Sequence, residues 1–537
     1  MSLRFDSYRS PVYGKRGIVA SSQPLASEAG MRILQQGGNA ADAAVATAAA
    51  LNVTEPCSTG IGGDCFSLYY EGKQKTVFGL NASGRAPAGL NLNFLANQEI
   101  IGSLPPLSVH TITVPGAAAG WVDTIEKFGT LTMKEVLAPA IELAEGGFPV
   151  APFTALAWKR SELLIKKGPY GEEMLLNGEA PKEGEIMKNP TLGQTFRTLA
   201  EHGKKGFYEG RIAEAIIDLI QSFNGVMSLD DLKNHHNTFD EPISTNYKGV
   251  DVFEIPPNGQ GITALIALNI LEEFDLAKMN HSSVEHLHVM IEAMRIAFAD
   301  TRWYVADPDV VNVPIKELIS KDYATERRKL IDLTKATVDT ERGSPFTSSD
   351  TVYFSVADSK GNACSFINSN YMGFGTGLIP QGCGFTLQNR GANFTLVAGH
   401  PNVLAPNKRP YHTIIPGMAT KDGELYASFG VMGGFNQPQG HAQVIINMVD
   451  YGMNPQQALN APRFTIRDGT SGGNVALEEG ISDSAMSALK SMGHEIIPTS
   501  GIARMIFGRG QIIKRDSKSG VLCGGTSPRA DGLAIAW

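Results

Sequence analysis

The stretch SSDTVYFSVADSKGNACSF, residues 348–366, has the pattern of a strand, a turn and a second strand. Apolar and polar residues alternate around Lys360-Gly361-Asn362, which is typical of a hairpin turn. The unusual feature is the start, because Thr351 opens the first strand directly after a polar loop that ends at Asp350. A lone threonine in that place raises the question of whether the loop is cut before it.

A cut between Asp350 and Thr351 would convert an ordinary side chain into a nucleophile. The threonine hydroxyl is weak by itself, but the free amine of the same residue can act as its base. An α-amino group titrates at about 7.7–8.0, close to working pH. The same hydroxyl could attack the Asp350 carbonyl, so that one residue performs both maturation and catalysis. Taken alone, however, these residues fit an ordinary strand start better.

The composition limits the class of protein. The chain has 537 residues, 42% of them hydrophobic and 19% charged, which is typical of a soluble globular protein with two ordinary domains or one large α/β unit. A net charge of −8 without a Lys/Arg stripe predicts no nucleic-acid partner. Five scattered cysteines predict reduced thiols. An N-terminus without an apolar leader and the lack of a membrane-length apolar run predict no membrane contact and a cytoplasmic location.

The spacing of apolar residues predicts a helix-rich first part and a strand-rich last part. Residues 25–51 read as two helices joined at Gly37-Gly38, with Ser27 and Asn39 as N-caps. Further helices are expected over 130–147, 191–222, 283–302, 440–460 and 482–492. Residues 322–350 are polar and read as an exposed loop, and the chain contains no internal repeat.

Seven motifs occur in a defined order along the chain. GGNAADAAVATAAALNVTEP and STGIGGDCF come first, followed by DTVYFSVADSKGNACSF, GFGTGLI, PNKRPYHTIIP, GVMGGFNQ and DYGMNPQQALNAPRF. Together they resemble the γ-glutamyltransferase family over nearly the whole chain. The resemblance implies an N-terminal-nucleophile hydrolase. Its implied fold is α+β, built as a four-layer αββα sandwich. It also implies self-cleavage into a large subunit, 1–350, and a small subunit, 351–537, which share one core and stay together as an αβ heterodimer.

The resemblance also assigns the catalytic roles. Thr351 would be the nucleophile, and the backbone N–H groups of Gly433 and Gly434 would form the oxyanion hole, a role that suits glycine because it allows close approach. Ser369 matches a family hydroxyl that hydrogen-bonds the nucleophile. Without the resemblance, the two glycines would read as a turn and Ser369 as a strand residue on a solvent face. No cofactor and no metal are expected.

The positions that clamp the amino-acid head of a γ-glutamyl group depart from the family. Ser83 replaces the arginine that grips the carboxylate, and Arg85 follows two residues later on the same strand face. The other substrate-binding positions hold Tyr371, Asn393 in place of an acid, His412 and Thr413. An acyl group with one carboxylate, bound by Arg85, and no ammonium is therefore predicted, as in the oxamate amidohydrolase and cephalosporin acylase-like branch. Whether His412 contacts substrate or fills the pocket wall stays open.

Rival interpretations rest on weaker patterns. A nucleophile elbow needs a strand before it and a helix after it, whereas the G-x-S-x-G match at 469–473 stands between RFTI and NVALEEG and reads as a hairpin turn. His286 and His288 are two apart on a helix and do not face each other, and the glycines of 373–377 lack dinucleotide-binding spacing. The sequence thus predicts a self-processing amidohydrolase acting on a small-molecule amide, with hydrolysis favoured over transfer. A genuine γ-glutamyl transpeptidase and an inactive binding protein are the alternatives.

Overall fold

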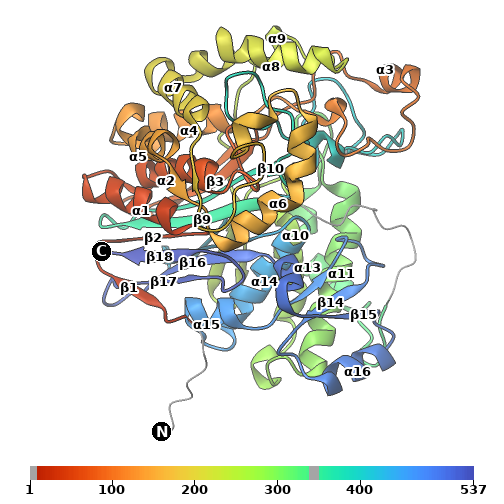
Figure 1. Cartoon of the computed structure of the whole chain (residues 1–537). Helices are drawn as coiled ribbons and strands as arrows, with labels where there is room; N and C mark the ends of the chain where they lie inside the picture. Colours follow the sequence, from red (N-terminus) through yellow and green to blue (C-terminus); the bar gives the residue numbers. More distant parts are fainter. Residues whose placement is uncertain (1–8, 338–349) are drawn as a thin grey trace.

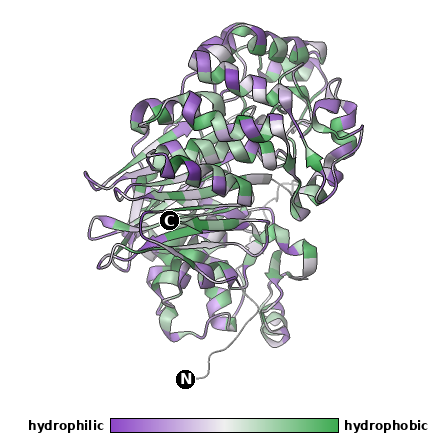
Figure 2. Cartoon of the chain, turned by 60° about the vertical axis from the view of Figure 1, so that its left-hand side comes forward, coloured by the Kyte–Doolittle hydropathy of each residue, from purple (hydrophilic) through white to green (hydrophobic). Residues whose placement is uncertain are grey.

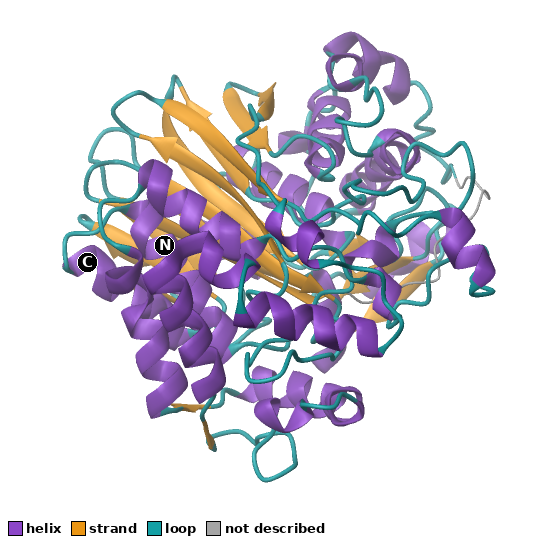
Figure 3. Ribbon diagram, turned by 90° about the horizontal axis from the view of Figure 1, so that it is seen from above, coloured by secondary structure: helices purple, strands orange, loops and turns teal. Residues whose placement is uncertain are grey.

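The chain folds into four layers, in the order helices, sheet, sheet, helices (Figure 1). The computed structural model describes residues 9–337 and 350–537. Seen from above, the strands cross the middle of the molecule beneath a layer of helices (Figure 3). This arrangement confirms the predicted α+β, four-layer αββα sandwich.

Two antiparallel sheets form the centre of the molecule. The six-stranded sheet has the order β18 (Leu533–Ala536), β2 (Gly17–Ser21), β9 (Asp350–Asp358), β10 (Ala363–Tyr371), β3 (Asp64–Glu71) and β4 (Thr76–Ala82). The seven-stranded sheet has the order β1 (Val12–Gly14), β17 (Leu522–Thr526), β16 (Arg509–Arg515), β12 (Glu424–Met432), β11 (Gly417–Lys421), β8 (Val250–Glu254) and β7 (Ile243–Tyr247). Both sheets therefore combine strands from before and after Thr351.

Helices cover the outer face of each sheet. On the six-stranded sheet these are α1 (Pro24–Gln35), α2 (Ala40–Thr54), α4 (Ala117–Phe128) and α5 (Met133–Gly146), with α6 (Pro152–Lys167), α7 (Pro190–Tyr208) and α8 (Arg211–Ser222) packed beyond them. On the seven-stranded sheet they are α10 (Gly261–Glu272), α11 (Val284–Tyr304), α14 (Asn436–Val449), α15 (Pro455–Asn460) and α16 (Asp483–Ser491). Figure 2 shows hydrophobic residues concentrated in the strands and polar ones on the outer helix surfaces.

The alternation of side chains along β9 orients Thr351. Val352 and Phe354 belong to the core between the sheet and the upper helices, whereas Tyr353 belongs to the core between the two sheets. Because successive side chains in a strand point to opposite faces, Thr351 shares the inter-sheet face of Tyr353. The first residue of the strand is thereby directed toward the seven-stranded sheet.

Several predicted boundaries differ from those observed. Asn39 caps α2 as predicted and forms a capping box with Asp42, but Ser27 lies inside α1, which begins at Pro24. Ser27 instead donates to the Leu533 carbonyl of β18, so its hydroxyl serves a long-range contact. The polar stretch predicted as a loop contains helix α13 (Lys321–Arg328), capped by Ser320. The part of that stretch over 338–349 lies outside the described residues.

Smaller elements complete the chain. The helical spacing over 191–222 corresponds to two helices, α7 and α8, and the helical stretch near 440–460 contains α14 and α15. The 469–473 motif is the turn of a hairpin between β13 (Phe464–Ile466) and β14 (Val475–Glu478), as predicted. β15 (Ile496–Thr499), β5 (Phe148–Pro149), β6 (Ile186–Met187), α3 (Leu92–Asn97), α9 (Leu229–Lys233) and α12 (Ile315–Leu318) lie at the periphery.

Gly430 of β12 is expected to be essential for the contact between the two sheets. A Cβ at this position would lie 2.4 Å from the Tyr353 ring. Tyr353 is held in place by its hydroxyl, which hydrogen-bonds Ser355 and Ser365. We expect Gly430→Ala to lower the free energy of unfolding by about 1–3 kcal/mol through overpacking, measured by thermal or denaturant unfolding. Gly146→Ala, where a Cβ meets nothing within 4 Å, is the control; an equal loss in both variants would contradict this account.

Candidate active site

Thr351 lies at the start of β9 and is buried. Its Oγ1 is 3.0 Å from the Oγ of Ser369 on the neighbouring strand β10. The Thr351 carbonyl accepts a hydrogen bond from Arg509 at 3.3 Å. The predicted nucleophile and the predicted partner hydroxyl are therefore in direct contact.

An irregularity at the end of β10 shapes this contact. The pairing of β10 with β9 shifts register between Asn368 and Tyr371. Tyr371 adopts a left-handed conformation with φ of 77°, and its N–H donates to Ser369 Oγ at 2.8 Å. Non-glycine residues rarely hold such a backbone unless the surrounding structure enforces it. The bulge turns the Tyr371 side chain to the pocket described below.

Arg390, which no sequence motif predicted, completes the hydroxyl network. Its guanidinium donates to Ser369 Oγ at 3.0 Å and to Thr413 Oγ1 at 2.7 Å, and it lies 4.7 Å from the centre of the Tyr371 ring. Burial lowers its pKa to about 10, opposed by the charge of Asp64. Arg390 therefore stays protonated at neutral pH. The Ser369 hydroxyl connects it to Thr351. The sequence feature that could have indicated Arg390 is that it is the single charged residue in GCGFTLQNRGANF, residues 382–394.

Gly433 and Gly434 follow β12 with φ of 134° and 56°. In the described part of the chain, neither N–H has a hydrogen-bond acceptor. The Gly434 carbonyl is fixed by the side chain of Gln260, which donates to it at 2.8 Å and to the Thr413 carbonyl at 2.6 Å. Unpaired backbone donors in a rigid turn have the character of an oxyanion hole.

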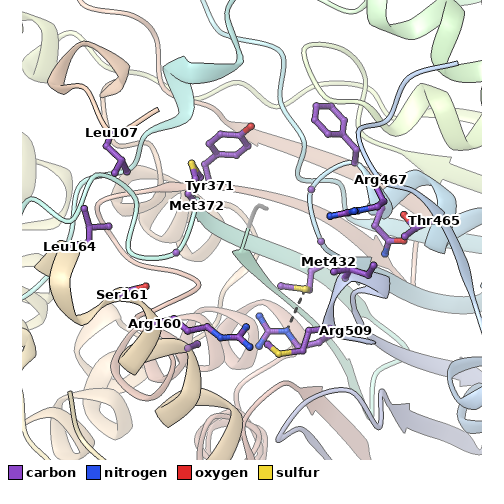
Figure 4. Close-up of a pocket in the computed structure, with 18 residues that line it drawn as sticks. Leu107, Arg160, Ser161, Leu164, Tyr371, Met372, Met432, Thr465, Arg467 and Arg509 are labelled. Atoms are coloured by element: carbon purple, nitrogen blue, oxygen red, sulfur yellow. Dashed lines mark hydrogen bonds between the residues drawn. The ribbon is translucent and has the colours of Figure 1, made fainter. Parts of the chain in front are cut away.

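A pocket of about 410 Å³ opens beside these groups (Figure 4). Tyr371, Met432, Gly433, Gly434 and Arg509 form its inner part. Its outer walls come from Leu107, from Arg160, Ser161 and Leu164 of α6, and from Thr465, Arg467, Met505 and Ile506. The pocket thus joins the two glycines to a larger, partly apolar space.

Arg509 ties the pocket to α2. It forms an ion pair with Glu55 at 2.5 Å and donates to Ser58 Oγ at 3.1 Å. Glu55 and Arg509 are both buried, and a buried charge is tolerated only when it is paired and hydrogen-bonded. Glu55 thus compensates the charge of Arg509, and the ion pair holds Arg509 where it bonds the Thr351 carbonyl.

Two of the predicted substrate residues are part of the internal network. The Nε2 of His412 lies 3.0 Å from Asp64, and its Nδ1 accepts from the Ile414 N–H at 3.3 Å. Burial, together with the charge of Arg390, lowers the pKa of His412 to about 3. Both ring nitrogens are engaged within the protein, and His412 is buried and does not line the pocket, so neither interpretation of the residue is supported. Thr413 contacts Arg390 and is thereby linked to Ser369.

The remaining predicted positions lie apart from the nucleophile or are otherwise engaged. Arg85 is directed to the His236 carbonyl at 3.1 Å and to Asp309 at 3.4 Å, and it does not line the pocket. Ser83 accepts from Asn258 at 3.0 Å. The Asn393 carbonyl accepts from Asn402 at 2.7 Å, while its buried side-chain Nδ2 has no acceptor in the described part. A carboxylate-binding role for Arg85 stays a prediction.

The rival motifs have structural explanations. His288 pairs with His494 at 2.8 Å, and the His286 ring lies 5.2 Å from that of His281, so the two helical histidines face different partners. Over residues 9–337 and 350–537, no group of three or more His, Cys, Asp or Glu is placed to hold a metal ion. In the same ranges, no helix is both long enough and apolar enough to span a membrane.

The layers and sheet order define the class of N-terminal-nucleophile hydrolases. The chain belongs to the gamma-glutamyltranspeptidase family, whose model matches residues 26–537. It is 36% identical to the glutathione hydrolase-like YwrD proenzyme of Bacillus subtilis over 98% of this chain and 99% of that one. It is 31% identical to the oxamate amidohydrolase proenzyme of Klebsiella pneumoniae over 97% of this chain and 98% of that one.

The same similarity extends to a solved structure. The cephalosporin acylase from Bacillus halodurans superimposes with a TM-score of 0.93 and 44% identity, covering 100% of this chain and 98% of that chain. The protein is therefore an enzyme, a hydrolase of this family near its acylase branch.

Arg390 is expected to support the reaction through Ser369. In Arg390→Met, the loss of a charge-assisted hydrogen bond should slow amide hydrolysis about 10- to 100-fold, measured as amine release by folded protein. Arg409→Met is the control, because Arg409 is also buried but bonds Thr238 and lies near Asp309. Equal activity in the two variants would show that Arg390 has only a packing role.

His412 is expected to make stability depend on pH. Its pKa is about 3 in the folded state against an ordinary value of 6.5. Its contribution is therefore complete above pH 6.5 and is lost as the pH falls toward 3, because only the unfolded imidazole binds a proton readily. His412→Gln should lower the melting temperature at pH 7.5 and flatten its decline between pH 6.5 and 4. Parallel curves for the two proteins would refute this assignment.

Proposed function

We propose that the protein is a self-processing amidohydrolase with Thr351 as its nucleophile. The supporting observation is the buried Thr351 hydroxyl, 3.0 Å from Ser369, in a site that also presents the unpaired N–H groups of Gly433 and Gly434. The proenzyme names of the relatives fit self-cleavage in this family.

Maturation requires no further residue. Thr351 Oγ attacks the Asp350 carbonyl, the acyl group moves from nitrogen to oxygen, and water hydrolyses the resulting ester. The products are a carboxyl-terminal Asp350 and a free amine on Thr351. Because each sheet contains hydrogen-bonded strands from both 1–350 and 351–537, the two subunits stay together as an αβ heterodimer.

The mature amine then acts as the base. It takes the proton of Thr351 Oγ as the oxygen bonds to the substrate carbonyl carbon, and the oxyanion lies between the Gly433 and Gly434 N–H groups. Collapse breaks the carbon–nitrogen bond, and the leaving amine receives the proton. Water repeats the sequence on the acyl-enzyme, releases the carboxylic acid and restores the hydroxyl. Hydrolysis is favoured over transfer.

The substrate is a small acyl amide without a recognised α-ammonium. Support comes from the head positions, which are occupied internally: Ser83 bonds Asn258, Tyr371 stacks on Arg390, and Asn393 replaces the acid. A buried ammonium without a carboxylate is costly. A γ-glutamyl amide is the alternative that the glutathione hydrolase-like relative suggests. A cytoplasmic location belongs to the same proposal, since no disulfide joins any of the five cysteines, all of them described.

Cleavage provides the first test. We expect wild type to yield two fragments, the smaller beginning at Thr351, whereas Thr351→Ala remains one chain of 57.5 kDa. Thr351→Ser, which keeps a hydroxyl, should cleave and retain part of the activity. Denaturing gels, intact mass and N-terminal sequencing measure this. A wild type that stays whole while folded would instead support an inactive binding protein.

A substrate panel provides the second test. Mature enzyme is assayed for amine release from glutaryl, γ-glutamyl and α-keto acyl amides with one common leaving group, and from oxamate. Hydrolysis of the glutaryl amide without hydrolysis of the γ-glutamyl amide supports an acyl group that lacks an ammonium. Preference for γ-glutamyl amides would favour the glutathione hydrolase alternative.

A further inference from the structure

The pocket beside the oxyanion glycines is lined by few of the acyl-head positions. Of the head positions at 83, 371, 393, 412 and 413, only Tyr371 lines the pocket. The other four are not part of its lining: Thr413 bonds Arg390, His412 bonds Asp64, and Ser83 and Asn393 bond Asn258 and Asn402. An amide held at Gly433 and Gly434 with its acyl group toward those positions must extend its amine half into the pocket.

The lining of this pocket is positively charged. Arg160, Arg467 and Arg509 line it, and its described lining contains no aspartate or glutamate. Figure 4 shows the Arg160 and Arg509 guanidinium groups pointing toward one another. The charge of Arg509 is compensated by Glu55. The excess charge therefore comes from Arg160 and Arg467.

The local sequence leaves Arg160 without a carboxylate. Glu162 is the single acid of α6, and it is engaged by Lys159 at 2.6 Å and Lys166 at 2.8 Å. No carboxylate in the described part of the chain pairs with Arg160, whose side chain is exposed at the pocket. Like charges gathered without counter-ions favour an anionic ligand.

Arg467 is in the same situation on the opposite wall. The adjacent acid, Asp468, accepts from the N–H and hydroxyl of Thr470 at 3.1 and 2.8 Å. Arg467 itself pairs with no carboxylate among the residues that the structure describes. Leu107, Leu164 and Ile506 also belong to the lining. The pocket thus combines an apolar body with two guanidinium groups at its walls.

We infer that this pocket binds the amine half of the substrate, and that Arg160 and Arg467 select an amine that carries a carboxylate on an apolar body. The inference rests on the proposed function for the orientation of the amide. A planar guanidinium matches a carboxylate through two parallel hydrogen bonds. Both arginines are specificity-determining residues and take no part in bond breaking.

Binding of the amine product tests the inference without turnover. Calorimetry of mature wild type should give about 5- to 50-fold tighter binding of 4-aminobenzoate than of neutral 4-aminobenzamide, and salt should reduce the difference. Arg160→Gln and Arg467→Gln should each remove most of this preference. Lys167→Gln, which removes an exposed charge from the end of the same helix, should keep it. Equal binding of the two amines, or a preference that survives both arginine variants, overturns the inference.

Kinetics distinguish this inference from the proposed function. With N-glutaryl-4-aminobenzoate and N-glutaryl-4-aminobenzamide, the arginine variants should raise KM for the anionic substrate alone and leave kcat and self-cleavage unchanged. If cleavage and hydrolysis proceed without discrimination between the two amides, the inference fails and the proposed function stands. If the anion binds as expected but neither cleavage nor hydrolysis occurs, the proposed function fails and the anion site stands.

Discussion

The packing of β9 against β12 across the two sheets is the constraint on which the site depends. Tyr353 fits against Gly430, where a Cβ would lie 2.4 Å from the ring, and this close approach sets the spacing of the strands. Thr351 lies two residues before Tyr353 on the same face of β9. Gly433 lies three residues after Gly430, just past the end of β12. The contact between Tyr353 and Gly430 therefore brings the start of β9, with Thr351, close to the end of β12, with Gly433.

Buried charge organises the rest of the site. Arg390 is held by Ser369, Thr413 and the Tyr371 ring, and Arg509 by Glu55 and Ser58. Burying a guanidinium is costly unless its donors are satisfied, so each arginine orders the groups around it. The two differ in what they supply. Arg509 is neutralised by a carboxylate, whereas Arg390 has hydroxyls as its hydrogen-bond partners and keeps a positive charge close to Thr351.

The proposed acyl side and the proposed amine side of the site differ in how their polar groups are paired. On the acyl side, polar groups bond one another: His412 with Asp64, and Ser83 with Asn258. On the amine side, Arg160 and Arg467 have no carboxylate partner among the described residues. Uncompensated charge favours a ligand of opposite charge, which the internally bonded His412 and Ser83 do not.

The sequence by itself determined the local and ordered features. The Thr351 hairpin, the Asn39 cap, the turn at 469–473 and the order of family motifs depend on neighbouring residues, and a pattern of neighbours is visible in a linear chain. Only the tertiary structure decided which distant residues meet. Arg390 reaches Ser369 from 21 positions away, Arg85 is directed to Asp309, and Arg160 and Arg467 enter one pocket from separate elements. These contacts arise from sheet packing and the bulge before Tyr371, which change where a side chain points without leaving a local pattern.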